Sequence, residues 1–217
     1  TRLFLRALDA GAPWLRTSPR STGLDPMPDG REVRWVFSPD DRPVSERFAE
    51  LLGGDPVRRL IVLAPFWDDE LRALQDLASA VRPRQGVVVV QTATVQFPVS
   101  ARKRVPFDIA GFERSPKRYL HAKLVIAEGR SRDHVLSGSG NCSVAAFGTS
   151  GRPSANCEAM LYQRMPAGTA VAALGLVETL SASPLTDLSE IAVHPSPGDD
   201  GKEAPPYPGL FEVHGRE

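Results

Sequence analysis

The sequence has little cysteine and no long apolar run, and each absence excludes a class of protein. Of its 217 residues only Cys142 and Cys157 are cysteines, and no CxxC motif occurs. This excludes the disulfide framework of small secreted domains and a cysteine-based zinc site, and we expect both thiols to be reduced. No apolar run approaches the roughly 20 residues that a membrane-spanning helix requires, and no signal peptide is visible. We therefore expect a cytoplasmic protein with no membrane partner.

Charge and composition do not favour one kind of partner. The 26 basic and 26 acidic side chains cancel, and 41% of the residues are hydrophobic. These values are ordinary for a globular domain that buries its own core without disulfides or metals. Net charge therefore neither favours nor excludes an anionic partner, and only local clusters of charge are informative.

Apolar side chains recur with the spacing of alternating strands and helices. Val44, Phe48 and Leu51 share one face of a helix, whereas residues 60–64 and 87–91 are apolar runs of the length of buried strands. This order predicts an α/β fold in which a mixed central β-sheet is flanked by helices on both faces. We expect strands at 33–37, 60–64, 87–91, 119–127, 134–139 and 157–163, helices at 44–52, 68–81 and 168–181, and a long connection at 92–118.

The same pattern divides the chain into three parts. Residues 1–32 are punctuated by Gly, Pro and Asp, and they predict a loop-rich N-terminal lead-in. Residues 33–194 are expected to form the α/β domain. Residues 195–217 are rich in Pro and Gly and predict a tail or linker.

Two polar side chains interrupt the strand expected at 119–127. Alternate side chains of a strand share a face, and one face of this segment is uniformly apolar and looks like core. His121, Lys123 and Val125 share the other face, so the imidazole and the ammonium project together. Such a pair is suited to attack on a phosphate, because the ammonium neutralises charge that develops on the non-bridging oxygens.

Further polar groups follow near the next two expected strands. Gly138 lets the backbone approach a ligand closely, and Ser139 and Asn141 offer hydrogen-bond donors to a phosphate. Glu158 places a carboxylate in an otherwise apolar strand, where it needs a partner. A carboxylate on one ring nitrogen of His121 would fix the tautomer that leaves the other nitrogen free as a nucleophile.

These residues resemble the HKD signature of the phospholipase D superfamily over roughly residues 44–163. The pattern reads, in order, His121-x-Lys123, an acidic residue, Gly138-Ser139-x-Asn141 and Asn156-x-Glu158. Glu128 stands where the signature has aspartate, and we expect it to be a turn residue and not a catalytic acid. The ordered set is more specific than either short motif alone.

The resemblance implies a phospholipase D-like catalytic domain over residues 33–194 and a two-step reaction without metal. His121 would form a phosphohistidine intermediate, and a second histidine would protonate the leaving oxygen and then activate water. Lys123, Ser139 and Asn141 would hold the phosphate oxygens, and Glu158 would orient His121. No cofactor is expected, and the sequence shows no cluster of metal ligands.

The family site requires two such motifs, and this sequence carries one. The remaining histidines, His134, His194 and His214, lack a lysine two residues further on. A homodimer would bring two copies of His121 together across a twofold axis. The alternative is a second catalytic half that lies outside this segment.

A basic stretch with interspersed aromatic residues leads into the motif. Its seven basic residues are Arg102, Lys103, Arg104, Arg114, Lys117, Arg118 and Lys123. Of these, we expect Arg114, Lys117 and Arg118 to contact substrate together with Gly138. Phosphate contacts and stacking suit nucleic acid, with DNA favoured over RNA, so a nuclease is the favoured function.

Other interpretations stay open at this point. The chain could be a phospholipid hydrolase or phosphatidyltransferase, or a catalytically silent module for nucleic-acid binding or dimerisation. His121 could be a structural histidine and Glu158 a surface charge of an edge strand. Residues 138–141 could form a simple turn in which Asn141 caps the next short helix, and the basic stretch could be a solvated loop.

Overall fold

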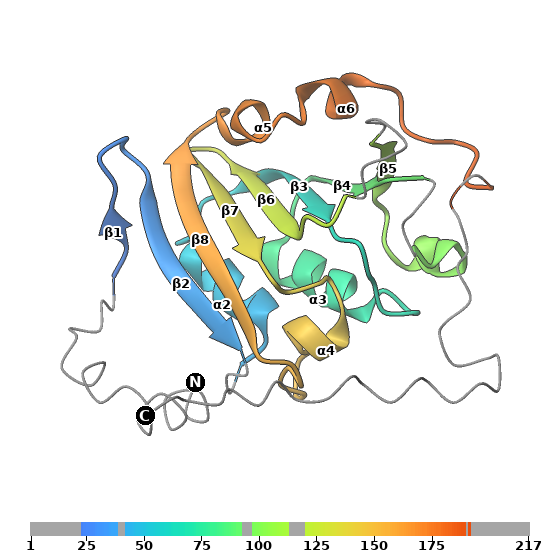
Figure 1. The fold of residues 1–217 in the computed structure, drawn as a ribbon, viewed down its shortest axis with the longest axis horizontal. Helices are drawn as coiled ribbons and strands as arrows, with labels where there is room; N and C mark the ends of the chain where they lie inside the picture. Colours follow the sequence, from blue (N-terminus) through green and yellow to red (C-terminus); the bar gives the residue numbers. More distant parts are fainter. Residues whose placement is uncertain (1–22, 39–41, 93–96, 113–119, 190, 192–217) are drawn as a thin grey trace, which may run out of the picture.

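The computed structural model of the chain describes residues 23–38, 42–92, 97–112, 120–189 and 191. They form an eight-stranded sheet in the order β1-β2-β8-β7-β6-β3-β4-β5 (Figure 1). β3, β4 and β5 run parallel to one another, and the other neighbours pair antiparallel. The strands are β1 (Asp25–Pro26), β2 (Glu32–Ser38), β3 (Val57–Leu63), β4 (Gln85–Val90), β5 (Asp108–Gly111), β6 (Leu124–Gly129), β7 (Arg132–Gly138) and β8 (Glu158–Pro166).

Helices cover both faces of this sheet, as Figure 1 shows. One face carries α2 (Val44–Leu51), α3 (Arg72–Val81) and α4 (Val144–Phe147), and the other carries α5 (Ala170–Ala173) and α6 (Val177–Ser181). A 3-10 helix, η2 (Val99–Arg104), precedes β5. The predicted α/β fold, with a mixed central sheet flanked by helices on both faces, is confirmed.

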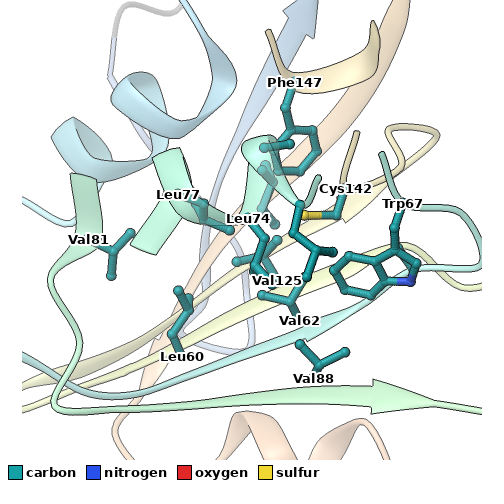
Figure 2. Packing of buried hydrophobic residues seen from close by; sticks show 14 of the residues in the cluster. Leu60, Val62, Trp67, Leu74, Leu77, Val81, Val88, Val125, Cys142 and Phe147 are labelled. Carbon is teal, nitrogen blue, oxygen red and sulfur yellow. The ribbon is translucent and has the colours of Figure 1, made fainter. Parts of the chain in front are cut away.

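The sheet separates two hydrophobic cores. In the larger core, Leu74 and Leu77 of α3 pack beside Leu60 and Val62 of β3 (Figure 2). The smaller core lies on the opposite face and contains Ile61, together with side chains of α5. Alternate residues of β3 therefore enter opposite cores, which explains why this strand reads as a continuous apolar run. Each fully buried leucine contributes roughly 1.5–3 kcal/mol of transfer free energy.

The strand predicted at 119–127 begins later than expected, at Leu124. The prediction that Val125 shares a strand face with His121 and Lys123 is wrong, because the strand does not include those two residues and Val125 is 2% exposed in the larger core. β6 is buried on both faces, because Val125 and Ala127 belong to the larger core and Ile126 to the smaller one. His121 and Lys123 instead occupy the segment just before the strand.

Two predicted helices also differ from the structure. The helix expected at 68–81 begins at Arg72, because Leu71 has a φ of 53° and the Asp68 carboxylate accepts the Arg72 N–H at 2.6 Å. The helix expected at 168–181 is divided into α5 and α6. Gly175, with a φ of 69°, lies between them and allows the chain to turn.

The connection expected at 92–118 contains two elements that the sequence did not indicate, η2 and β5. β5 has only four residues, which is too short for its apolar pattern to be distinguished from a loop. The predicted lead-in includes β1, and the predicted tail at 195–217 lies outside the described residues. None of the described helices is long and apolar enough to cross a membrane.

Candidate active site

The motif residues gather at one edge of the sheet, which we call the site edge. β2, β3, β4, β5 and β7 end there, whereas β6 and β8 begin there. His121 and Lys123 lie just before β6, Ser139 follows β7, and Glu158 is the first residue of β8. Residues far apart in the sequence are therefore brought together by the ends of neighbouring strands.

The His121 and Lys123 side chains contact each other at this edge. The Lys123 Nζ lies 3.1 Å from His121 Nε2, 3.3 Å from Nδ1 and 3.3 Å from the His121 carbonyl oxygen. The His121 side chain is exposed, and that of Lys123 is half-buried. The ring of Phe66 meets the imidazole edge-on, with centroids 6.5 Å apart. The predicted pairing of imidazole and ammonium is therefore present, although it does not arise from strand alternation.

The segment that carries this pair is fixed on both sides by hydrogen bonds. The side-chain oxygen of Gln91 accepts the Leu120 N–H at 2.7 Å, and the Gly138 N–H donates to the Lys123 carbonyl at 3.3 Å. Gln91 is 6% exposed and follows β4 directly. Sequence reasoning missed both Gln91 and Phe66. The signal for Gln91 was a polar residue at the end of a buried apolar run.

The charge on Lys123 is tuned by its surroundings. Burial of the ammonium lowers the pKa of Lys123 from its ordinary value of 10.5, and the nearby negative charge of Glu158 partly opposes that shift. Glu158 is therefore close enough to act on Lys123 electrostatically. The site thus combines an ammonium, an imidazole ring and a carboxylate on one edge.

Ser139 and Glu158 are joined directly. The Ser139 hydroxyl donates to Glu158 Oε2, and Asn156 Nδ2 donates to Glu158 Oε1 at 3.1 Å. The Ser139 Oγ also accepts the Ala159 N–H at 3.0 Å. These bonds fix the carboxylate beside the end of β7. The predicted role of Glu158 in orienting His121 stays a prediction.

Gly138 is required by close backbone packing between β7 and β8. A Cβ at this position would lie 2.3 Å from the Ala159 carbonyl oxygen and 2.7 Å from the Met160 Cα, and φ is 155°. Backbone atoms cannot move aside as a flexible side chain can, so a larger residue would push the strands apart. The glycine thus sets the position of Ser139 relative to Lys123.

Asn141 lies in the turn that follows. Its side-chain oxygen is buried and has no hydrogen-bond partner within the part of the chain that the structure describes. The suggestion that Asn141 caps the next helix is wrong, because Ser143 occupies the N-cap position of α4. The predicted contact between Asn141 and phosphate stays a prediction.

A cavity opens beside the pair. It has a volume of about 450 Å³, and its lining includes His121, Lys123 and Gly138 together with Leu174 and Leu176 from the region of α5 and α6. Most of its other lining residues are apolar. This cavity can therefore admit a compact charged group together with an apolar or planar group.

The basic stretch is described only in part. Arg102, Lys103 and Arg104 lie in η2, and Arg104 contacts Glu70 at 3.3 Å. The predicted substrate contacts Arg114, Lys117 and Arg118 lie outside the described residues. Their role stays a prediction.

Glu128 lies away from the site edge. The prediction that it is a turn residue is wrong, because it belongs to β6, is 6% exposed, and forms an ion pair with Arg59 of β3 at 2.6 Å. It sits near the end of β6 that is opposite Lys123. The acidic position of the motif is therefore structural in this geometry.

Among the described residues, no group of three or more His, Cys, Asp and Glu side chains could hold a metal ion. The chemical groups available at the site edge are thus an imidazole, an ammonium, a hydroxyl, an amide and a carboxylate. Together they can position and attack a phosphorus centre.

No family model matches the sequence, and no curated protein matches it. Several solved structures match the fold. Nuc from Salmonella typhimurium, described as a phospholipase D family member, has 13% identity and a TM-score of 0.44, and the match covers 71% of this chain and 98% of that one. NucT from Helicobacter pylori has 18% identity, a TM-score of 0.43, and coverage of 71% of this chain and 98% of its own.

A mutant of yeast tyrosyl-DNA phosphodiesterase also matches, with 17% identity and a TM-score of 0.37. That match covers 60% of this chain, which spans only 32% of the yeast chain.

Proposed function

We propose that this chain is one half of a phosphodiesterase that uses a histidine nucleophile and needs no metal ion. The observation that carries the proposal is the contact between the His121 ring and the Lys123 ammonium, 3.1 Å apart beside an open cavity of about 450 Å³. A structural histidine would be expected in a core, whereas His121 is exposed. The imidazole is thus accessible to a substrate, and the adjacent Lys123 ammonium can stabilise the negative charge of the substrate's phosphate.

In the first step, a ring nitrogen of His121 donates its lone pair to phosphorus, and the bond from phosphorus to the leaving ester oxygen breaks. The leaving oxygen takes a proton from a second histidine. Lys123 compensates the charge on the non-bridging oxygens, and Ser139 and Asn141 are placed to hydrogen-bond them. The product of this step is a phosphohistidine.

In the second step, the now neutral second histidine takes a proton from water, and the oxygen of that water attacks phosphorus. The bond between phosphorus and the His121 nitrogen breaks, which restores the imidazole. Glu158 holds Ser139 through a hydrogen bond throughout. The reaction balances with water as the only co-reactant.

The second histidine comes from a second copy of the chain or from a half outside this segment. His134 does not fit the role, because it is 1% exposed and lies 2.6 Å from the Tyr162 hydroxyl. His194 and His214 lie outside the described residues. A homodimer is the simpler proposal, since one twofold axis then completes two equivalent sites.

Nucleic acid is the proposed substrate, with DNA favoured over RNA. Arg102 and Lys103 of η2 line a second cavity of about 750 Å³. These two side chains add positive charge outside the site edge. Together with the basic residues just before His121, they suit a polyanionic backbone. A charge-dependent interaction of this kind weakens as the salt concentration rises.

The first prediction concerns His121 itself. We expect the native chain to cleave DNA in excess EDTA, and His121→Ala to lower the rate by about 10⁴-fold or more because the nucleophile is removed. Cleavage is followed with a labelled strand, and folding with circular dichroism. Arg130→Ala is the matched control, because Arg130 is exposed at the opposite end of β6 and β7.

Three outcomes would contradict the proposal. They are loss of activity on chelation while the fold persists, full activity of His121→Ala, and release of head groups from phosphatidylcholine vesicles without any cleavage of nucleic acid.

A further inference from the structure

An exposed tryptophan lies on the same face of the sheet as the catalytic cavity. Trp35 on β2 is 60% exposed, and its ring stacks on that of Phe37 with centroids 6.0 Å apart and an angle of 16° between the planes. Burial of so large an aromatic surface would normally stabilise a fold, so an exposed tryptophan beside a second ring indicates a binding surface. We call Trp35 and Phe37 the aromatic pair.

The strand registers place the aromatic pair in line with the site. Trp35 pairs with Leu161, Leu161 with Ser137, and Ser137 with Leu124. Directly paired residues point to the same face of a sheet, and both Ser137 and Leu124 line the cavity that contains His121. Three strand intervals separate Trp35 from Leu124, which is a distance of roughly 14 Å.

The surface between the aromatic pair and the site carries mostly small side chains, and Leu161 is the large one among them. Gly138, Ser139 and Ala159 are exposed, and Ser137 and Leu161 are half-buried. Small side chains in this position leave room for a chain to lie across β7 and β8. Because Ser139 bonds to Glu158 and to the Ala159 N–H, this strip is also held rigidly against the catalytic carboxylate.

The helices that cover this face of the sheet, α5 and α6, do not lie over the aromatic pair. α5 packs mainly against β6 and β7, and α6 packs mainly against β5. Figure 1 shows both helices displaced from β2, towards the β6 and β5 side of the sheet. Among the described helices, α5 and α6 therefore cover the neighbouring core and lie away from Trp35, which is 60% exposed.

We propose that the aromatic pair is a stacking site for a base of single-stranded nucleic acid whose phosphate lies at His121 and Lys123. The inference rests on the proposed function and specifies its substrate. An exposed indole offers a flat face that any base can stack on, and the strip of small residues leads from it to the phosphate site. A base within a duplex is already stacked and paired, so its faces are not available. The site therefore favours single strands.

A second copy of the chain is the competing occupant. A stable protein interface buries roughly 800 Å² on each partner around a well-packed apolar centre. Ala159 pairs with Phe37 and Leu161, which is half-buried, pairs with Trp35, and beyond them the strip continues through Ser137 and Ser139. The strip is also continuous with the catalytic cavity, where substrate has to pass. These features favour a nucleic-acid strand.

The test compares binding of two fluorescein-labelled strands by anisotropy, an oligothymidylate and an abasic strand of the same length. All variants carry His121→Ala, so that the strands remain intact. With Trp35 present, we expect the abasic strand to bind about 10-fold more weakly than the oligothymidylate. In Trp35→Ala the difference between the strands should fall below about 2-fold, and Trp35→Phe should retain most of it. Val177→Ala, which alters another exposed apolar residue, should behave as the parent does.

Some outcomes would overturn the inference. In one, Trp35→Ala still discriminates between the strands. In another, it weakens binding of both strands equally. A change in oligomeric state of Trp35→Ala by light scattering would assign the surface to a second copy.

Cleavage of methyl p-nitrophenyl phosphate, which has no base, separates this inference from the proposed function. If the native chain cleaves that ester but Trp35→Ala leaves the difference in binding between the two strands unchanged, the proposed function is supported and the stacking site is excluded. If base-dependent binding persists without any cleavage, the stacking site stands and the proposed reaction fails.

Discussion

Lys123 is the residue whose environment most directly controls the proposed chemistry. Burial lowers its pKa from 10.5, against the opposing effect of Glu158. The Lys123 side chain is positively charged below that lowered pKa, and it loses its charge as the pH rises through the pKa. In the proposed reaction, the charge that would bind phosphate is therefore lost at a pH below 10.5, on the alkaline side of the expected activity profile.

From this we predict that kcat/KM for methyl p-nitrophenyl phosphate falls on the alkaline side in the native chain. In Lys123→Arg that fall should be absent or shifted upward, because a guanidinium stays protonated to above pH of about 12. Both profiles are measured by release of p-nitrophenolate. An unchanged alkaline fall in Lys123→Arg would assign it to another group.

The residues of the site divide by how far the sequence could reveal them. His121, Lys123, Ser139 and Glu158 belong to an ordered motif, and the structure places all of them at one edge. Gln91 belongs to no such motif, and its local signal was limited to a polar residue at the end of a buried apolar run. Its partner Leu120 is 29 residues away, so the sequence pattern does not reveal which backbone group Gln91 holds.

At the scale of elements, the turn between β6 and β7 is clamped by one carboxylate. Asp55 accepts the backbone N–H groups of Arg130 at 3.1 Å, Ser131 at 3.1 Å and Arg132 at 3.0 Å. Burial raises the pKa of Asp55, but the hydrogen bonds from Ser131 and Arg132 outweigh it and leave the pKa below 3.8. A clamp that depends on the carboxylate must weaken when it is protonated.

We predict that Asp55→Asn lowers the free energy of unfolding by about 1–3 kcal/mol near neutral pH. Because the folded-state pKa is depressed, the stabilisation is complete above the unfolded value of 3.8 and is lost as the pH falls through the lower folded value. The difference between native and variant in urea unfolding should therefore shrink in acid. Asp25→Asn, at an exposed position on β1, is the control. An equal difference at all pH values would exclude the carboxylate's charge as the cause.

The elements differ in how well the sequence predicted them. β3 and β4 are central, so their continuous apolar runs were sufficient. The start of β6 was not predicted, because residues 120–123 carry an alternating pattern without being paired in the sheet. Hydrophobic periodicity records which side chains are buried, and it does not record where hydrogen bonding to a neighbouring strand begins.

At the scale of the whole molecule, the sequence was sufficient to predict the class of fold. In the proposed reaction each copy supplies one exposed histidine, His121, and two histidines are needed to attack phosphorus and to protonate the leaving group. The number of chains in the active species is therefore a chemical requirement of the proposal and cannot be read from the sequence pattern.

We predict that light scattering gives twice the mass of the chain and that specific activity falls on dilution below the dimer dissociation constant. Dilution removes the partner's histidine while leaving each copy folded. Circular dichroism on the diluted sample monitors that folding. A strict monomer with concentration-independent activity would show that two copies are not required.

The direction in which β6 runs has a practical consequence. Its first residue adjoins Lys123, and its last residue enters the short turn that Asp55 holds, so the catalytic edge and the turn are separated by the full length of the strand. Side chains at Arg130 and Ser131 are exposed, although their backbone N–H groups are engaged. The Ser131 hydroxyl also donates to Asp55 at 3.0 Å, so Arg130 is the better point of attachment. A fluorophore or a tether attached through the side chain at position 130 would report on the protein, or anchor it to a support, far from the proposed nucleic-acid path.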